Sequence, residues 1–154
     1  MKGKPEIIEK LNFLLADELT AVNQYFVHAE ECGDWGYEVL HESIEKRSIG
    51  EMKHAEKLIS RILFLGGTPV VDKLNKIHIA DNVTGMLEND KKAEEDAIKD
   101  YNDAIKLATE LLDNGTKELL EAILRDEEEH IDYIEAQLEQ IEQMGLEQYL
   151  TTVK

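Results

Sequence analysis

Cysteine is almost absent from this sequence, because Cys32 is the only one among 154 residues. A single thiol cannot form an intrachain disulfide or hold an iron–sulfur cluster, and it excludes a rubredoxin-type module with paired cysteines. Any metal chemistry must therefore rely on oxygen and nitrogen ligands, with methionine as a further sulfur donor.

Long apolar runs and basic residues are also scarce. The longest uninterrupted apolar run extends only from Ile62 to Leu65, whereas a helix needs about 20 apolar residues to cross a bilayer. The amino terminus lacks the apolar stretch of a secretory signal, so we expect a cytoplasmic protein without a membrane partner. With 17 Lys and Arg against 34 Asp and Glu, the net charge of −17 repels nucleic-acid phosphates and anionic lipids. Cations are the expected small partners.

The few prolines and glycines divide the chain into helical segments. Pro5 opens the first apolar pattern of helical period, and breaks follow at 34–36, 66–69 and 113–116. We expect long helices over 5–33, 37–64, 83–111 and 116–144, ended by Gly145, and a short fifth helix over 146–152. No segment reads as a sheet. The length and the 42% hydrophobic content predict one domain over 1–154.

One connection, residues 66–82, is long for a compact all-α domain. A 28-residue helix is about 42 Å long at about 1.5 Å per residue, and 17 extended residues reach roughly 55 Å. This segment can therefore run the whole length of a bundle and leave the second and third helices parallel. The predicted fold is an all-α four-helix bundle with one long crossover.

Polar residues interrupt the apolar stripe of each long helix at corresponding places. These residues are Glu18, Glu51, His54, Glu94, Glu127 and His130. Four buried carboxylates near one another repel unless cations or protons neutralise them. Two divalent ions offset four such charges, and two neutral imidazoles complete the ligand set. The pattern predicts a dinuclear metal centre.

Spacing along the helices supports this interpretation. Two Glu-x-x-His motifs, at 51–54 and 127–130, each place an oxygen and a nitrogen ligand one turn apart. Counted from the turn at Trp35, Glu18 is level with the first motif, and a reversal near Leu112 makes Glu94 level with the second. The alternative is a metal-free bundle with polar core layers, which are normally small and neutral.

Further segments carry a resemblance that covers essentially the whole chain. They are Asp17-Glu18-Leu19, Asn23-Gln24-Tyr25-Phe26, Asp34-Trp35-Gly36, Glu51-Met52-Lys53-His54-Ala55, Arg61-Ile62-Leu63-Phe64-Leu65, Leu124-Arg125-Asp126-Glu127-Glu128-Glu129-His130 and Met144-Gly145-Leu146-Glu147-Gln148-Tyr149-Leu150. With them the chain resembles the bacterioferritins, the haem-containing bacterial branch of the ferritin-like proteins.

The resemblance implies a ferroxidase centre that oxidises Fe(II) with O2 or H2O2. In it Glu18 and His54 would hold one iron, Glu94 and His130 the other, and Glu51 and Glu127 would bridge them. The family deposits ferric mineral inside a hollow shell of 24 chains built from dimers, and a ferredoxin is the expected reductant for iron release. Carboxylate oxygens favour the harder Fe(III).

A second apolar stripe on the second helix suggests another partner. Met52 lies about 100° round the helix from Glu51, beside Ile49, Ile59 and Leu63, and faces away from the bundle core. The resemblance implies that Met52 is an axial ligand of haem b or a related iron porphyrin at the twofold axis of a dimer.

Two positions depart from the pattern of some bacterioferritins, which carry a His and an Asp where this chain has Lys46 and Gly50. Neither residue here can ligate metal, so we expect either that electrons or iron take a different path between cavity and centre, or that the centre works more as a gate for iron. Tyr25, two turns from Glu18, is a candidate for a redox role. Two other functions remain open: a di-iron or di-manganese peroxidase or catalase with the same six ligands, and an interaction bundle without metal.

Overall fold

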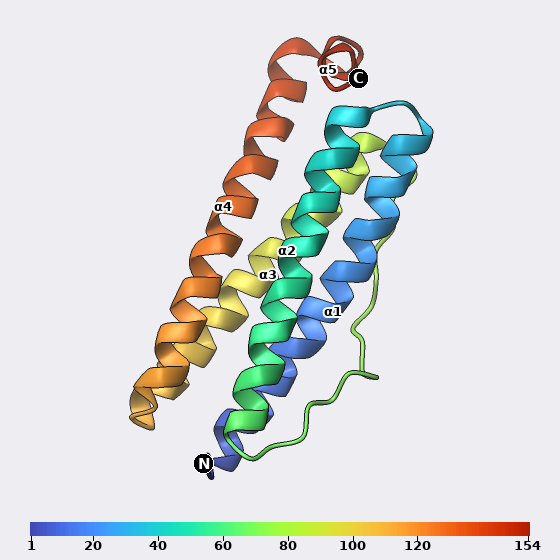
Figure 1. Cartoon of the computed structure of the whole chain (residues 1–154). Coiled ribbons are helices and arrows are strands. Elements are labelled where there is room, and N and C mark those ends of the chain that lie inside the picture. Colours follow the sequence, from blue (N-terminus) through green and yellow to red (C-terminus); the bar gives the residue numbers. More distant parts are fainter.

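The computed structural model describes residues 1–154 and contains five helices and no strand (Figure 1). They are α1 (Pro5–Asp34), α2 (Glu38–Phe64), α3 (Val83–Glu110), α4 (Asn114–Met144) and α5 (Leu146–Thr152). The predicted four-helix bundle with a short fifth helix is confirmed, and each helix begins and ends within two residues of its predicted bounds. None of these helices combines the length and apolar character that crossing a membrane requires.

Local chemistry sets the helix ends. Pro5 lies in the first turn of α1, where its missing N–H costs no hydrogen bond. The largest difference from prediction is at α4, which begins at Asn114 rather than at 116. Asp113 caps α4 by accepting a hydrogen bond from the Thr116 N–H at 3.1 Å, and Leu112, with φ of 58°, reverses the chain just before it.

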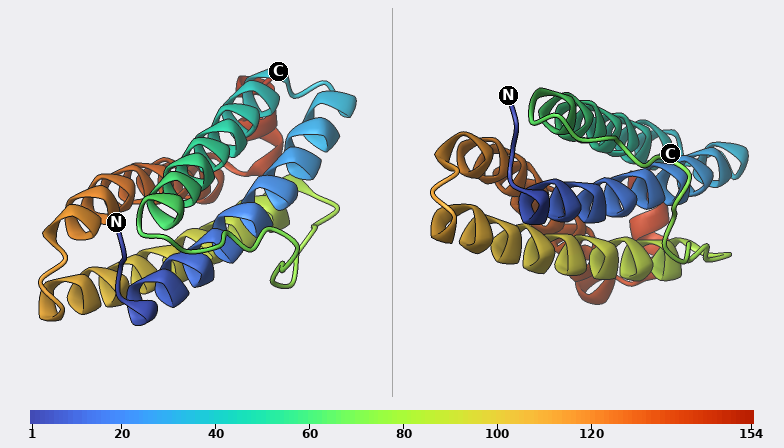
Figure 2. Two further views of the ribbon diagram at one scale, coloured as in Figure 1. Left: turned by 60° about the horizontal axis from the view of Figure 1, so that its bottom comes forward. Right: turned by 90° about the horizontal axis from the view of Figure 1, so that it is seen from below.

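The helices form two antiparallel pairs joined by the crossover. α1 packs closely on α2, and α3 packs closely on α4, whereas α2 and α4 contact each other only sparsely. Residues 65–82 return along α1 to the opposite end of the bundle, so that α2 and α3 run parallel (Figures 1 and 2). The predicted role of this segment as a full-length crossover is confirmed.

Polar side chains of α1 bind the crossover along its length. Four of them accept hydrogen bonds from its backbone N–H groups: Asn12 from Val70, Thr20 from Asn75, Gln24 from His78 and His28 from Ala80. The last three acceptors are four residues apart, so they line one face of the helix. The α1 side chains thereby supply acceptors to the backbone N–H groups of a segment without secondary structure. These groups would otherwise lose their hydrogen-bond partners on burial.

The core consists of two apolar clusters separated by a polar layer. One cluster includes Leu14, Leu58 and Tyr101, and the other includes Tyr25, Ile44 and Leu87. All four carboxylates predicted on the apolar stripes lie in the sequence between residues of the two clusters, and all four are buried. The fold therefore places a charged layer midway along an otherwise apolar bundle.

Candidate metal centre

All six predicted ligands meet inside the bundle. Two groups of donor atoms each lie within 4.8 Å of one another: Glu18, Glu51, His54 and Glu127 form one, and Glu51, Glu94, Glu127 and His130 form the other. Glu51 and Glu127 belong to both groups. Each long helix contributes at least one donor, so the centre exists only in the assembled bundle.

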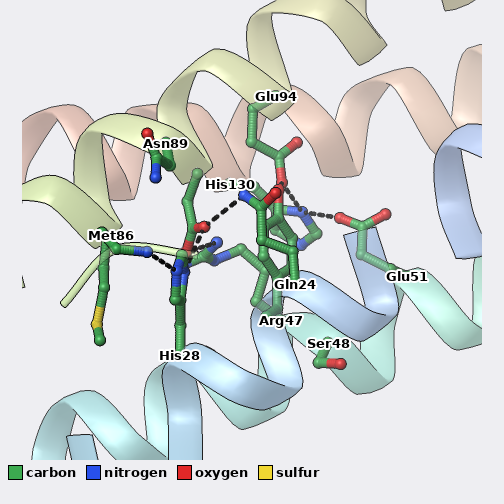
Figure 3. A network of polar contacts seen from close by, with 12 residues as sticks. Gln24, His28, Arg47, Ser48, Glu51, Met86, Asn89, Glu94 and His130 are labelled. Atoms are coloured by element: carbon green, nitrogen blue, oxygen red, sulfur yellow. Dashed lines mark hydrogen bonds and ion pairs between the residues drawn. The ribbon is translucent and has the colours of Figure 1, made fainter. Parts of the chain in front are cut away.

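The two histidines face the carboxylates through the same ring nitrogen. Nδ1 of His54 lies 2.8 Å from Glu127 Oε1, 3.2 Å from Glu51 Oε2 and 3.5 Å from Glu18 Oε2. Nδ1 of His130 lies 2.9 Å from Glu51 Oε1 and 3.4 Å from Glu94 Oε1. Figure 3 shows His130 with Glu94 and Glu51 on either side. Each imidazole thus lies between the shared pair, Glu51 and Glu127, and one terminal glutamate that belongs to a single group. The terminal glutamate is Glu18 for His54 and Glu94 for His130.

Burial and mutual repulsion disturb the charges of the cluster. Burial, reinforced by neighbouring carboxylates, raises the pKa of Glu51 and of Glu127 well above the usual range. Burial would also raise the pKa of Glu94, but hydrogen bonds with Glu127 and His130 outweigh it and lower that pKa to about 2. Without metal, protons must therefore neutralise part of the cluster, which is the task that divalent cations perform when bound.

The donor atoms fit a pair of metal ions. Buried carboxylate oxygens normally have hydrogen-bond partners, yet Oε2 of Glu18 and Oε2 of Glu94 have none. These two atoms belong to the two terminal carboxylates, one in each group. Hard anionic oxygens combined with imidazole nitrogens suit iron, so the residues present match the predicted di-iron centre.

Two buried tyrosines hold the terminal carboxylates. The hydroxyl of Tyr25 donates to Glu94 Oε1 at 2.8 Å, and that of Tyr101 donates to Glu18 Oε1 at 2.5 Å. The sequence pattern placed Tyr25 near Glu18, but its hydroxyl contacts Glu94 on α3 instead. The hydrogen bond from Tyr101 to Glu18 was not foreseen from the sequence.

A buried ionic network beside the centre was also missed from the sequence. The Asp90 carboxylate contacts Gln24 at 2.9 Å, His28 at 2.8 Å and Arg47 at 3.0 Å. Figure 3 shows these three partners gathered beside the centre. The Arg47 guanidinium lies 4.3 Å from the centroid of the Tyr25 ring. Burial opposes ionisation of Asp90, but the charge of Arg47 together with the contacts of His28 and Gln24 outweighs burial and lowers the pKa of Asp90. The only sequence signal was that Asp90 lies one turn before Glu94.

Two cavities reach the cluster. One of about 450 Å³ is lined by Glu18, Glu51 and Glu127, together with Asp17 of α1 and His78 of the crossover. The other, of about 780 Å³, is lined by residues of α2 and α4 and includes His130. The carboxylates and His130 are therefore reached through different parts of the surface.

Met52 lies outside the metal centre. Its side chain is 39% exposed, as are Ile49 at 37% and Leu63 at 60%. Ile49, Met52 and Leu63 of the second apolar stripe predicted on α2 therefore face solvent in the single chain, whereas Ile59, predicted on the same stripe, packs against the apolar core.

Comparison with known proteins agrees with this geometry. The family model described as the ferritin-like domain matches residues 8–144. The chain is 43% identical to bacterioferritin of Brucella melitensis over 149 residues, which cover 97% of this chain and 92% of that protein. It is 42% identical to bacterioferritin of Streptomyces coelicolor over 153 residues, which cover 99% and 92%. For bacterioferritin of Rhodobacter capsulatus the identity is 40% over 145 residues, covering 94% and 90%. With this similarity over nearly its whole length, the chain belongs to the bacterioferritins, within the ferritin-like family.

Proposed function

We propose that this protein stores iron and detoxifies it, acting as a ferroxidase that oxidises Fe(II) to Fe(III) at the buried centre. The observation that carries the proposal is the meeting of four carboxylates and two imidazoles from four helices. Iron bound there reduces O2 or H2O2, and the ferric product is deposited as mineral inside a hollow oligomeric shell.

The ligand roles follow from the two donor groups. Glu18 and His54 would hold one iron, and Glu94 and His130 would hold the other. Glu51 and Glu127 are the residues common to both groups, so they would serve both ions. Four negative charges against two divalent ions leave the loaded centre neutral, which suits a site in an apolar bundle.

Residues around the centre keep its ligands in place. Tyr25 and Tyr101 each donate to one oxygen of a terminal carboxylate, which leaves the other oxygen for metal. When metal binds, Glu51 and Glu127 lose the protons that their raised pKa values favour. Metal loading therefore releases protons and is promoted by higher pH.

The smaller cavity provides the path by which Fe(II) reaches the carboxylates. It lies between α1, α3 and the crossover and is lined by Glu18, Glu51 and Glu127, and Asp96 of α3 adds an anionic side chain to its lining. Anionic side chains along a cavity attract cations by raising their local concentration.

Haem binding and full assembly extend the proposal. The exposed thioether of Met52 would bind haem b or a related iron porphyrin, together with Met52 of a second chain in a dimer. Twelve such dimers form a 24-chain shell in the cytoplasm. The haem would supply one-electron chemistry for iron release, with a ferredoxin as the reductant.

Anaerobic titration of Fe(II) into the metal-free protein tests the centre. Calorimetry should find two tightly bound irons per chain in the parent, and Glu127→Ala should lose tight binding because both ions share this ligand. Glu128→Ala, an exposed neighbour, is the matched control and should bind as the parent does. A parent without stoichiometric binding would refute the ferroxidase assignment.

Substitution of Met52 by leucine tests the haem ligand separately. Met52→Leu keeps the volume and apolar character of the side chain but removes the sulfur. We expect the reconstituted variant to lose the absorption spectrum of bis-thioether haem while its Fe(II) stoichiometry stays at two per chain. An unchanged haem spectrum would exclude Met52 as the ligand.

Size-exclusion chromatography separates storage from turnover of a small substrate. A 24-chain shell of 17.6 kDa subunits elutes far ahead of a monomeric or dimeric peroxidase. A small particle would favour the enzymatic alternative on the same bundle.

A further inference from the structure

The metal centre has an internal twofold pattern. Residues of α1 and α2 have counterparts 76 positions later in α3 and α4, as 94 minus 18 and 130 minus 54 show. The pairs are Glu18 with Glu94, Tyr25 with Tyr101, Glu51 with Glu127, and His54 with His130. Contacts follow the same pattern, because each tyrosine donates to the glutamate of the other half.

One pair of counterparts, Gly50 and Asp126, breaks this pattern. The difference concerns Nε2, the histidine ring nitrogen that does not face the glutamates. Nε2 of His54 lies 2.9 Å from Oδ2 of Asp126. The counterpart of Asp126 in the first half is Gly50, which has no side chain to offer. Nε2 of His130 accordingly has no hydrogen-bond partner within the chain. An added Cβ at Gly50 would lie 3.8 Å from this nitrogen, so the missing carboxylate is the one that would face it.

Exposure follows the same asymmetry. The side chain of His54 is 3% exposed, whereas that of His130 is 21% exposed. His130 and Gly50 both line the 780 Å³ cavity between α2 and α4, two helices that contact each other only sparsely. One histidine is thus enclosed and anchored, and the other borders an open space without an anchor.

Carboxylates behind ligating histidines affect metal binding directly. They fix the tautomer and the ring orientation and increase the basicity of the ligand, and their removal typically weakens metal binding about 10- to 100-fold. We propose that the two metal positions differ in affinity. Asp126 positions His54, so the position of Glu18 and His54 binds metal tightly. Gly50 offers His130 no such partner, so the position of Glu94 and His130 binds metal more weakly and exchanges it through the α2–α4 cavity. This inference rests on the proposed dinuclear centre.

Stepwise metal binding tests the inequality. Anaerobic calorimetry with Co(II), which does not turn over, should resolve two steps per chain in the parent, with dissociation constants about 10-fold or more apart. Gly50→Asp should tighten the second step by a similar factor. Gly50→Ala is the matched control, because it adds the Cβ at an ordinary contact distance without the carboxylate, and it should leave both steps unchanged.

Asp126 is tested from the opposite direction. Asp126→Ala should weaken the first step about 10-fold or more and bring the two constants together. Asp126→Asn, whose amide oxygen can still accept from the imidazole, should recover most of the loss. Glu128→Ala, at an exposed position that lines neither cavity, should change neither step.

A spectroscopic readout reports on the histidines themselves. In the Co(II)-loaded parent, proton NMR should show one hyperfine-shifted imidazole N–H that exchanges slowly with solvent, from His54. Asp126→Ala should broaden that signal, and Gly50→Asp should add a second slow signal from His130. A change in general stability would not produce this pattern.

The possible failures are distinguishable. Two steps of equal affinity in the parent, or equal behaviour of Gly50→Asp and Gly50→Ala, would overturn the inequality and leave the dinuclear centre intact. Binding of fewer than two Co(II) ions at any concentration would instead refute the dinuclear centre.

Discussion

Single residues around the centre carry charges that the apolar core would exclude if they were unpaired. Arg47 and Asp90 are both buried, and their atoms meet at 3.0 Å. His28 and Gln24 add hydrogen bonds to the same carboxylate, and Arg47 also covers the ring of Tyr25. Because Tyr25 in turn donates to Glu94, the network connects the core of the bundle to a predicted ligand.

Arg47→Met should destabilise the metal-free protein by about 3 kcal/mol, because removing one partner leaves a buried charge uncompensated. His28 remains beside Asp90, which keeps the loss at the low end of the usual range. Urea unfolding measures the effect, and Arg125→Met, at an exposed position on α4, is the control. Arg47→Met combined with Asp90→Leu should recover part of the stability. A loss no larger than that of Arg125→Met would show that the pair is dispensable.

At the scale of elements, helix ends decide where the reversals fall and hence which ligands are level. Asp113 accepts from the Thr116 N–H at 3.1 Å and from the Thr116 hydroxyl at 2.7 Å, and it also binds Arg61 of α2 at 3.0 Å. The Asp113 side chain thus caps the first turn of α4 and binds that end of the helix to α2. This contact contributes to the axial register that brings Glu127 level with Glu51.

Asp113→Ala should therefore lower the free energy of unfolding by about 2 kcal/mol, the upper end for loss of an N-cap, since the contact with Arg61 is lost as well. Asp113→Asn keeps the capping oxygen but not the charge and should lose about half as much. Urea midpoints at fixed chain concentration measure both, with Asp103→Ala on the exposed face of α3 as control. An Asp113→Ala variant as stable as the parent would mean that packing alone fixes the start of α4.

The whole molecule carries a net charge of −17. Three of its carboxyl groups that are shielded from solvent, those of Asp17, Glu51 and Glu127, have raised pKa values and therefore favour the protonated form. Burial and the neighbouring Asp100 raise the pKa of Asp17 to about 8, and burial raises the pKa of Glu51 and Glu127. A carboxyl group with a raised pKa in the folded state stabilises the fold below its ordinary pKa. That contribution is lost as the pH rises toward the folded value.

Metal-free protein should accordingly lose stability between about pH 5 and pH 8, with residues 1–154 unfolding as one domain. Saturating Co(II) should reduce this dependence, because the metal takes the place of protons at Glu51 and Glu127 and leaves Asp17 as the main contributor. Thermal midpoints across this pH range, with and without Co(II), measure both slopes. Midpoints that rise with pH in the metal-free protein would contradict the inferred protonation.

The sequence by itself determined the helices, the crossover and the six candidate ligands, because helical periodicity and capping are local and a carboxylate on an apolar stripe is visible without a structure. Only the tertiary structure decided which side chains meet across helices. Asp90 with His28 and Asp126 with His54 are separated by 62 and 72 residues. Such contacts depend on the rotation and axial register of packed helices, which no local pattern encodes. For the same reason Gly50 reads in the sequence as a missing ligand and only in the fold as the missing anchor of His130.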